Sequence, residues 1–322
     1  AMIADKADAV IVPVRIEGLE RSPWSYMRPS QIKKAWFPRV TVTILPPRRL
    51  EVDPALKGRA RRQSAGLALQ DVMVDTAVEC ADLERSLFTA LAEAHETRDT
   101  GKIIVEDPLR TRLTYKKLIT GAQVLGAKLE RLAPVGGHVG VLLPNTAAVA
   151  VTFFALQGIG RVPAMLNFTA GTKNLLSACQ AAEVGAILTS RSFVEKGRLE
   201  SVIAELSKSV EIVYLEDVRA RITFTDKVRG LLAGSRPRVA RQPDDPAAVL
   251  FTSGSEGAPK GVVLSHRNIL ANAIQSLTRV AAHGEDKVFN VLPVFHSFGL
   301  TAGMVMPLIG GVPVYLYPSP LH

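Results

Sequence analysis

Residues 252–261 combine side chains and backbone that could bind a polyphosphate. They read TSGSEGAPKG, in which two glycines let the chain curl and bring its N–H groups close to phosphate oxygens. Three hydroxyls add short donors, and a lysine adds a full positive charge. Such a loop could orient and neutralise a nucleotide's triphosphate tail while its α-phosphate is attacked. The residues expected to bind these phosphates are Thr252, Ser253, Gly254, Ser255, Gly257, Lys260 and Gly261.

The loop does not have the spacing of a Walker P-loop. That pattern places Gly-Lys five residues after its first glycine and a helix directly behind. Counting from Gly254, Pro259 stands at that place, and Lys260 precedes Gly261. An apolar strand follows, so both spacing and context exclude the GTPase and P-loop kinase classes. A loop rich in Gly, Ser and Pro is often only a turn, but the full ordered set favours a binding loop.

The flanking segments predict how this loop is held. Residues 247–251 are an apolar run typical of a buried strand, and residues 262–264 predict a second short strand. Ser265 is a good N-cap for a helix that begins at His266. A cation is disfavoured in the first turn of a helix, so we expect His266 to be neutral and structural.

Strands and helices alternate from residue 102 to residue 215. This alternation predicts an α/β fold with a mostly parallel, doubly wound sheet. Thr114 is the expected N-cap of the first helix of this series. The expected strands are 102–106, 138–143, 162–167, 186–189 and 211–215, and the expected helices are 114–132, 144–160, 172–182 and 193–207.

The first part of the chain has a different character. Short β-branched runs at 9–14 and 40–45 predict strands, and the basic residues 46–62 predict a connecting loop. A helix is expected over 65–83, continuing through Leu87 and Leu91 at helical spacing. We therefore predict three parts: residues 1–64, a helical linker at 65–83, and a larger domain at 84–322.

The chain carries a net charge of +9, concentrated in two basic runs at 48–62 and 219–241. Such runs are usually solvated loops, and attraction to anionic lipid or an acidic carrier protein is the alternative. Nucleic acid is excluded as a partner because no stacking aromatics or reading motif accompany the charge. Cys80 and Cys179 lie in helical stretches without metal-ligand spacing, which predicts buried free thiols and is consistent with a reducing cytosol. The apolar residues 146–160 and 300–317 are better explained by buried elements than by membrane spans.

Residues 252–261 resemble the signature loop of the AMP-binding, adenylate-forming superfamily. Two further segments support this resemblance: 291–299 (VLPVFHSFG) is similar to the second core motif, and 160–171 (GRVPAMLNFTAG) to a strand entering a Pro-containing turn. The likeness covers about residues 84–322. The superfamily includes acyl-CoA synthetases, acyl-carrier-protein synthetases, luciferase and peptide-synthetase adenylation domains.

The resemblance implies a reaction in two halves and a set of substrates. A fatty carboxylate would attack the α-phosphate of ATP with Mg²⁺, and the pantetheine thiol of acyl carrier protein or CoA would then displace AMP. Phe295 and His296 would line the acyl or thiol pocket, although His296 could instead be a satisfied histidine at a strand end. Lys260 could be a solvent-facing lysine, and Asn167 is expected to hold a turn.

Residues 9–18 and 35–47 resemble the closing strands of a glycerophospholipid acyltransferase domain. An acyltransferase ahead of an AMP-binding domain is the order in bifunctional ligases that recycle lysophospholipid at the cytoplasmic face of the bacterial inner membrane. Arg15 and Glu17 would then lie at the edge of an acyltransferase site or simply on the surface.

Several motifs of both families do not occur in this sequence. These are the acyltransferase His-x4-Asp and the ligase elements Tyr-Gly-x-Thr-Glu and Thr-Gly-Asp. We therefore expect an internal stretch that ends ahead of the small C-terminal domain and completes neither reaction. A CoA ligase for another acid and a non-catalytic membrane-associated scaffold are the alternative functions.

Overall fold

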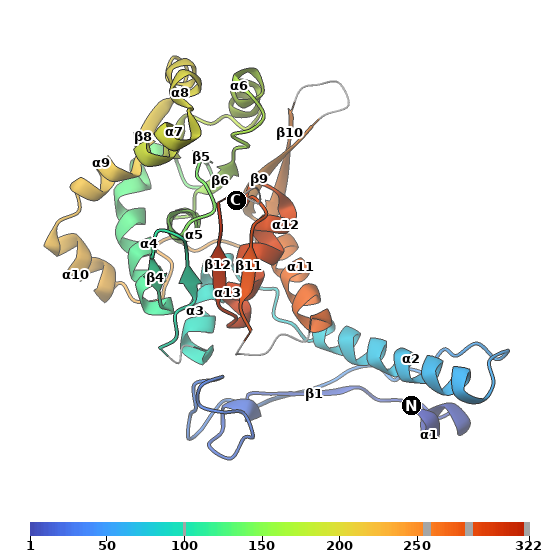
Figure 1. Cartoon of the computed structure of the whole chain (residues 1–322). Coiled ribbons are helices and arrows are strands. Elements are labelled where there is room, and N and C mark those ends of the chain that lie inside the picture. The colour runs from blue at the N-terminus through green and yellow to red at the C-terminus, as the bar shows by residue number, and fades with distance from the viewer. Residues whose placement is uncertain (99–100, 254–258, 281–285, 319–322) are drawn as a thin grey trace. The chain divides into compact units, whose positions relative to one another are not determined.

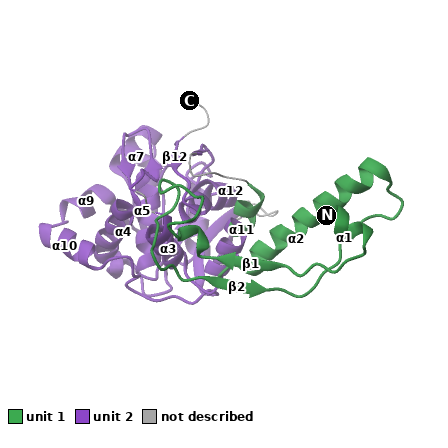
Figure 2. Ribbon diagram, turned by 90° about the horizontal axis from the view of Figure 1, so that it is seen from below, with its two compact units in different colours: residues 1–82, 274–281 green, residues 83–273, 282–322 purple. Residues whose placement is uncertain are grey.

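The computed structural model describes residues 1–98, 101–253, 259–280 and 286–318, and the side chain of Ser253 lies outside that description. The chain divides into two compact units, Ala1–Asp82 with Ile274–Ala281 and Leu83–Ala273 with Ala282–His322 (Figure 2). Each unit is described by itself below.

A six-stranded sheet forms the centre of the second unit, in the order β10-β9-β6-β5-β7-β8 (Figure 1). All neighbours are parallel except β10, which pairs antiparallel with β9 at one edge. The mostly parallel α/β sheet predicted from the sequence is confirmed. The strands are β5 (His138–Val141), β6 (Val162–Met165), β7 (Ala186–Thr189), β8 (Glu211–Tyr214), β9 (Pro246–Ser253) and β10 (Pro259–Ser265).

Helices cover both faces of this sheet because its strands are apolar on both sides. Neighbouring residues of one strand enter opposite cores: Ala164 packs in one hydrophobic cluster and Met165 in the other. The helices of the first cluster include α3 (Leu87–Arg98), α4 (Tyr115–Leu129) and α5 (Ala147–Gly158), and those of the second are α6 (Thr172–Ala181), α7 (Arg191–Gly197) and α8 (Glu200–Leu206).

A smaller sheet of order β11-β12-β3-β4 completes the second unit. Its strands are β3 (Val105–Glu106), β4 (Arg112–Leu113), β11 (Val288–Asn290) and β12 (Val314–Leu316), all parallel to their neighbours except β4. The remaining helices are α9 (Leu215–Ala220), α10 (Phe224–Leu232), α11 (His266–Arg279), α12 (Ser297–Leu300), a π-helix (Thr301–Val305) and α13 (Met306–Gly310).

Several predicted helix boundaries were wrong, each for a local reason. The helix expected across 65–91 is two helices, α2 (Gly58–Glu79) and α3, because Ser86 Oγ accepts the N–H of Thr89 and starts a new helix. The helix expected over 193–207 breaks at Arg198, which has φ 52° between α7 and α8. The basic run around 219–241 contains α9 and α10 instead of an extended loop, with a Thr223–Asp226 capping box at the start of α10.

The first unit pairs β1 (Val14–Glu17) antiparallel with β2 (Thr41–Ile44), beside α1 (Met2–Lys6) and α2. The strand predicted at 9–14 was placed too early, since only Ile11 bridges there and Pro13, which has no N–H, precedes β1. Within β1, Arg15 pairs with Glu17 at 3.0 Å.

The first basic run also differs from the expected loop. Helix α2 begins at Gly58, inside the segment predicted as a connection. Arg61 binds both carboxylate oxygens of Asp5, and Arg48 lies 3.6 Å from Asp75, so part of the charge is neutralised by ion pairs. No helix in the described part of the chain is both long and apolar enough to cross a bilayer.

Candidate active site

The two ends of the predicted phosphate loop meet in the β9–β10 hairpin. Lys260 is the direct cross-strand partner of Thr252, and Gly261 is the partner of Phe251. Directly opposed residues of an antiparallel pair share one face, so the Thr252 hydroxyl and the Lys260 ammonium lie on the same face of the hairpin. Both residues are exposed. Gly254, Ser255 and Gly257 lie outside the described residues, and Ser253 is the last residue of β9.

Gly261 has a steric reason to be glycine. A Cβ at this position would lie 3.3 Å from Val249 Cγ1 and 3.6 Å from the Phe251 ring. The first of these distances is tighter than a usual carbon–carbon contact. A larger residue would therefore push on β9 beside the loop.

The hairpin lies at the carboxyl edge of the parallel strands, which is where open α/β sheets bind ligands. Its neighbours at this edge are β6, whose end leads to Phe168, and then β5, whose end leads to Asn145. Both of these residues contact the segment 292–296 that follows β11. The predicted second motif is therefore held at the same edge as the loop.

Asn145 fixes that segment through its backbone. Its Nδ2 donates to Leu292 O at 2.6 Å, and its Oδ1 accepts the N–H of Val294 at 3.0 Å. Asn145 is 3% exposed, and its bond with the Val294 N–H is shielded from water, whereas its bond to Leu292 O is part-buried. The sequence analysis missed this positioning role. A polar residue directly after a buried strand was the available signal.

Phe295 and His296 occupy different environments. The Phe295 ring is buried and packs edge-to-face on Phe168, with centroids 5.0 Å apart, and Phe168 packs equally close to Phe193. His296 is exposed, its ring 4.7 Å from that of Phe295, at the residue that precedes α12. An aromatic wall with an imidazole at its edge could line a pocket for an acyl group.

The π-helix that follows this segment in the chain packs closely against the side chain of Asn290. Asn290 Nδ2 donates to Gly299 O at 3.1 Å, and Asn290 Oδ1 accepts the N–H of Leu292 at 3.0 Å. A Cβ on Gly303 would lie 2.3 Å from Asn290 Nδ2, and one on Gly299 would lie 2.2 Å from Pro293 O. The two glycines therefore permit the close approach that places the Phe295–His296 turn. Single π-turns of this kind are frequent near functional sites.

The two polar residues expected to be structural behave as predicted. Asn167 Oδ1 accepts from both the N–H and the hydroxyl of Thr169, which forms a turn. His266 is buried, and its Nδ1 accepts the N–H of Leu87 at 3.1 Å. Burial, with a smaller contribution from Arg241, lowers the pKa of His266 to about 4, so the ring is neutral near pH 7. Ser265 and Asn268 bond each other's backbone N–H at the start of α11.

The arrangement suits a nucleotide better than a resident metal. Thr252 and Lys260 supply a hydroxyl and a cation for phosphate oxygens. Among the described residues, no group of three or more His, Cys, Asp or Glu could hold a metal ion. A Mg²⁺ ion that arrives with ATP is bound mainly by the phosphates themselves, which is compatible with this set.

A mostly parallel sheet whose carboxyl edge carries the Thr252–Lys260 pair has the architecture of an α/β nucleotide-binding protein. The family model described as "AMP-binding enzyme" matches residues 92–322, and the chain belongs to this family. The bifunctional type expected from the sequence remains a proposal.

The similar proteins include thiol ligases for different acids. The chain is 31% identical over 197 residues to 4-coumarate–CoA ligase 2 of Oryza sativa subsp. japonica, covering 57% of this chain and 35% of that ligase. It is 29% identical over 208 residues to sulfoacetate–CoA ligase of Cupriavidus necator, covering 62% and 38%. The chain thus spans little more than a third of the length of these curated relatives.

Solved structures share the fold. VinN in complex with 3-methylaspartate has a TM-score of 0.61 at 23% identity, over 73% of this chain and 63% of that one. The anthranilate CoA ligase AuaEII in complex with anthranoyl-AMP has a TM-score of 0.60 at 20% identity, over 75% and 46%. At these identities the likeness extends to the fold alone.

Asn145→Ala is expected to lower the free energy of unfolding by about 2 kcal/mol, because Leu292 O and the Val294 N–H would both lose a buried partner. Urea titration of the wild type and the variant measures this difference. Asn174→Ala, which removes one bond to Ala170 O on a half-buried helix, is the matched control and should cost less than about 1 kcal/mol. A smaller loss for Asn145→Ala than for the control would contradict the positioning role.

Proposed function

We propose that this chain is the nucleotide-binding part of an AMP-forming acid–thiol ligase. The pairing of Thr252 with Lys260 at the exposed end of the β9–β10 hairpin is the observation that carries the proposal. The family match and the shared fold support it. Gly254, Ser255 and Gly257 are proposed to complete the phosphate site with their backbone and hydroxyl groups.

In the first half-reaction, an oxygen of the acid's carboxylate forms a bond to the α-phosphorus of ATP. The bond from that phosphorus to the bridging oxygen breaks, and pyrophosphate leaves with the electron pair. Lys260 and the loop hydroxyls hold the negative charge of the β- and γ-phosphates during this displacement. Mg²⁺, when bound with ATP, adds further neutralisation of the same oxygens.

In the second half-reaction, a thiol sulfur attacks the acyl carbon of the adenylate. The carbon–oxygen bond to AMP breaks, and the thiol proton is released to solvent or a base. Phe295 and His296 are proposed to line the path of the acyl group or the thiol, because they stand at the carboxyl edge that also holds the loop.

The acid is proposed to be a fatty acid and the acceptor the pantetheine thiol of an acyl carrier protein. An acidic carrier would suit the basic side chains of α9 and α10, Arg219, Lys227 and Arg229, which form no ion pair with another described residue. The similarity of residues 9–18 and 35–47 to an acyltransferase supports coupling to lysophospholipid acylation at the cytoplasmic face of the inner membrane. CoA as acceptor is the second candidate, since the named relatives include CoA ligases.

Lys260→Ala is expected to weaken binding of Mg-ATP about tenfold, because a charge-assisted contact to phosphate is lost. Calorimetric titration of the chain with Mg-ATP measures the affinity. Lys196→Ala removes an exposed lysine from α7 and should leave the affinity unchanged. Absence of any ATP affinity in the wild type would overturn the proposal and favour a non-catalytic scaffold. Equal affinities of the wild type and Lys260→Ala for Mg-ATP would show that Lys260 does not bind the phosphates.

A further inference from the structure

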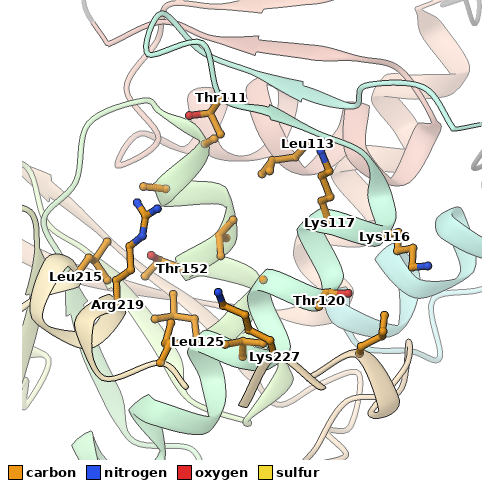
Figure 3. A pocket seen from close by; sticks show the side chains of 17 residues that line it. Thr111, Leu113, Lys116, Lys117, Thr120, Leu125, Thr152, Leu215, Arg219 and Lys227 are labelled. Atoms are coloured by element: carbon orange, nitrogen blue, oxygen red, sulfur yellow. The ribbon is translucent and has the colours of Figure 1, made fainter. Parts of the chain in front are cut away.

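A pocket of about 1180 Å³ lies in the second unit among α4, α5, α9 and α10 (Figure 3). None of its lining residues belongs to the proposed adenylation site. Pockets that hold drug-sized ligands are about 300–1000 Å³, so this one has room for an extended aliphatic chain. Its apolar wall includes Leu113, Val124, Leu125, Val151, Leu215 and Leu231.

Four cationic side chains line the same pocket: Lys116, Lys117, Arg219 and Lys227. In Figure 3, Arg219 and Lys227 enter from the α9–α10 side and Lys117 enters from α4. No carboxylate is among the described lining residues, and none of the four cations forms an ion pair within the described part of the chain. The pocket therefore has an uncompensated positive charge over an apolar wall.

The one acidic residue of α10 is engaged elsewhere. Asp226 lies 2.7 Å from Lys128 and also accepts from the backbone N–H of Thr223. Its carboxylate is thus committed to the helix cap and to α4. This leaves Lys227, the next residue, facing the pocket without a carboxylate to balance it.

We propose that this pocket binds a single-chain amphiphile with an anionic head, such as a long-chain carboxylate or an alkyl phosphate. The cations bind the head, and the apolar wall buries the chain. No aromatic side chain is among the described residues that line the pocket, so a nucleotide base would find no stacking partner among them. The site is separate from the β9–β10 loop and does not depend on adenylation.

The direct test is displacement of fluorescent 11-(dansylamino)undecanoate from the whole chain by unlabelled chains, below their micellar concentrations. Affinity should rise about fourfold for each methylene added from decanoate to tetradecanoate, because each buried methylene contributes a constant increment. Dodecanol and dodecyltrimethylammonium should bind at least tenfold more weakly than dodecanoate. Tighter binding of dodecyl phosphate than of dodecanoate would support a phosphate head, and the reverse order a carboxylate.

Lys227→Gln and Arg219→Gln should each weaken dodecanoate binding about tenfold. Arg229→Gln is the matched control, since it removes the same charge from α10 at a position that does not line the pocket. Val151→Phe, which places a ring in the pocket, should abolish binding of all chains.

Three results would overturn the inference. The first is equal affinity for dodecanoate and dodecyltrimethylammonium, which would show that the pocket does not distinguish an anionic from a cationic head group. The second is an equal effect of Arg229→Gln and Lys227→Gln, which would show that the anion is attracted by the overall surface charge and not by the cations that line the pocket. The third is tight binding that survives Val151→Phe in a variant whose circular dichroism matches the wild type.

Discussion

Gly303→Ala is expected to lower the free energy of unfolding by about 4 kcal/mol, a large loss for a methyl group. The new Cβ would lie 2.3–2.5 Å from three atoms of the Asn290 side chain. That side chain cannot move freely, because it is buried and bonded to Gly299 O and to the N–H of Leu292. Displacing it would leave the buried carbonyl of Gly299 without its donor, at about 1–3 kcal/mol, and would also break the part-buried bond from the Leu292 N–H.

Urea unfolding followed by circular dichroism measures this loss. Gly121→Ala, in helix α4, is the matched control. Its Cβ would meet only the two methyl groups of Val151, at 3.5 and 3.9 Å, and the substitution should stabilise the chain by up to about 1 kcal/mol. In an Asn290→Ala background, Gly303→Ala should cost little, because the clashing atoms are gone. Full additivity of the two substitutions would show that the clash is not the cause.

The strands of the six-stranded sheet could be predicted from sequence because each is a short apolar run between turn residues. Residues 186–189 were predicted as the strand that β7 forms, and Thr114 does cap α4 by accepting the N–H of Lys117. Such features depend on neighbours in the sequence. The pairing of Lys260 with Thr252 also follows locally, since a hairpin joins them.

The errors arose where the local pattern was ambiguous. The helix breaks at Arg198, the residue with positive φ, and Gly197 directly before it is a single glycine of the kind that a helical pattern tolerates. The clamp from Asn145 to Leu292 and Val294 joins residues almost 150 positions apart, and the contact of Phe168 with Phe295 is equally remote. The types and spacing of residues along the sequence do not tell which distant residues come into contact. The contacts that support the site could therefore be identified only in the folded structure.

His266 should make the chain's stability depend on pH between about 4 and 6.5. Its pKa is lowered to about 4 in the folded state by burial, whereas an unfolded histidine titrates near 6.5. Between these values the unfolded state binds more protons, so the free energy of unfolding rises with pH across the window. The full contribution, about 3 kcal/mol, is present above pH 6.5 and is lost as the pH falls through the window to about 4.

His266→Asn is the informative variant, because its amide oxygen can still accept the N–H of Leu87 but cannot titrate. The difference in unfolding free energy between the wild type and this variant should change by about 3 kcal/mol between pH 4 and pH 7. Parallel profiles for the wild type and His266→Asn would contradict a buried neutral ring. His266→Ala should be less stable than His266→Asn at every pH by about 1–3 kcal/mol, because the Leu87 N–H would then be buried without an acceptor.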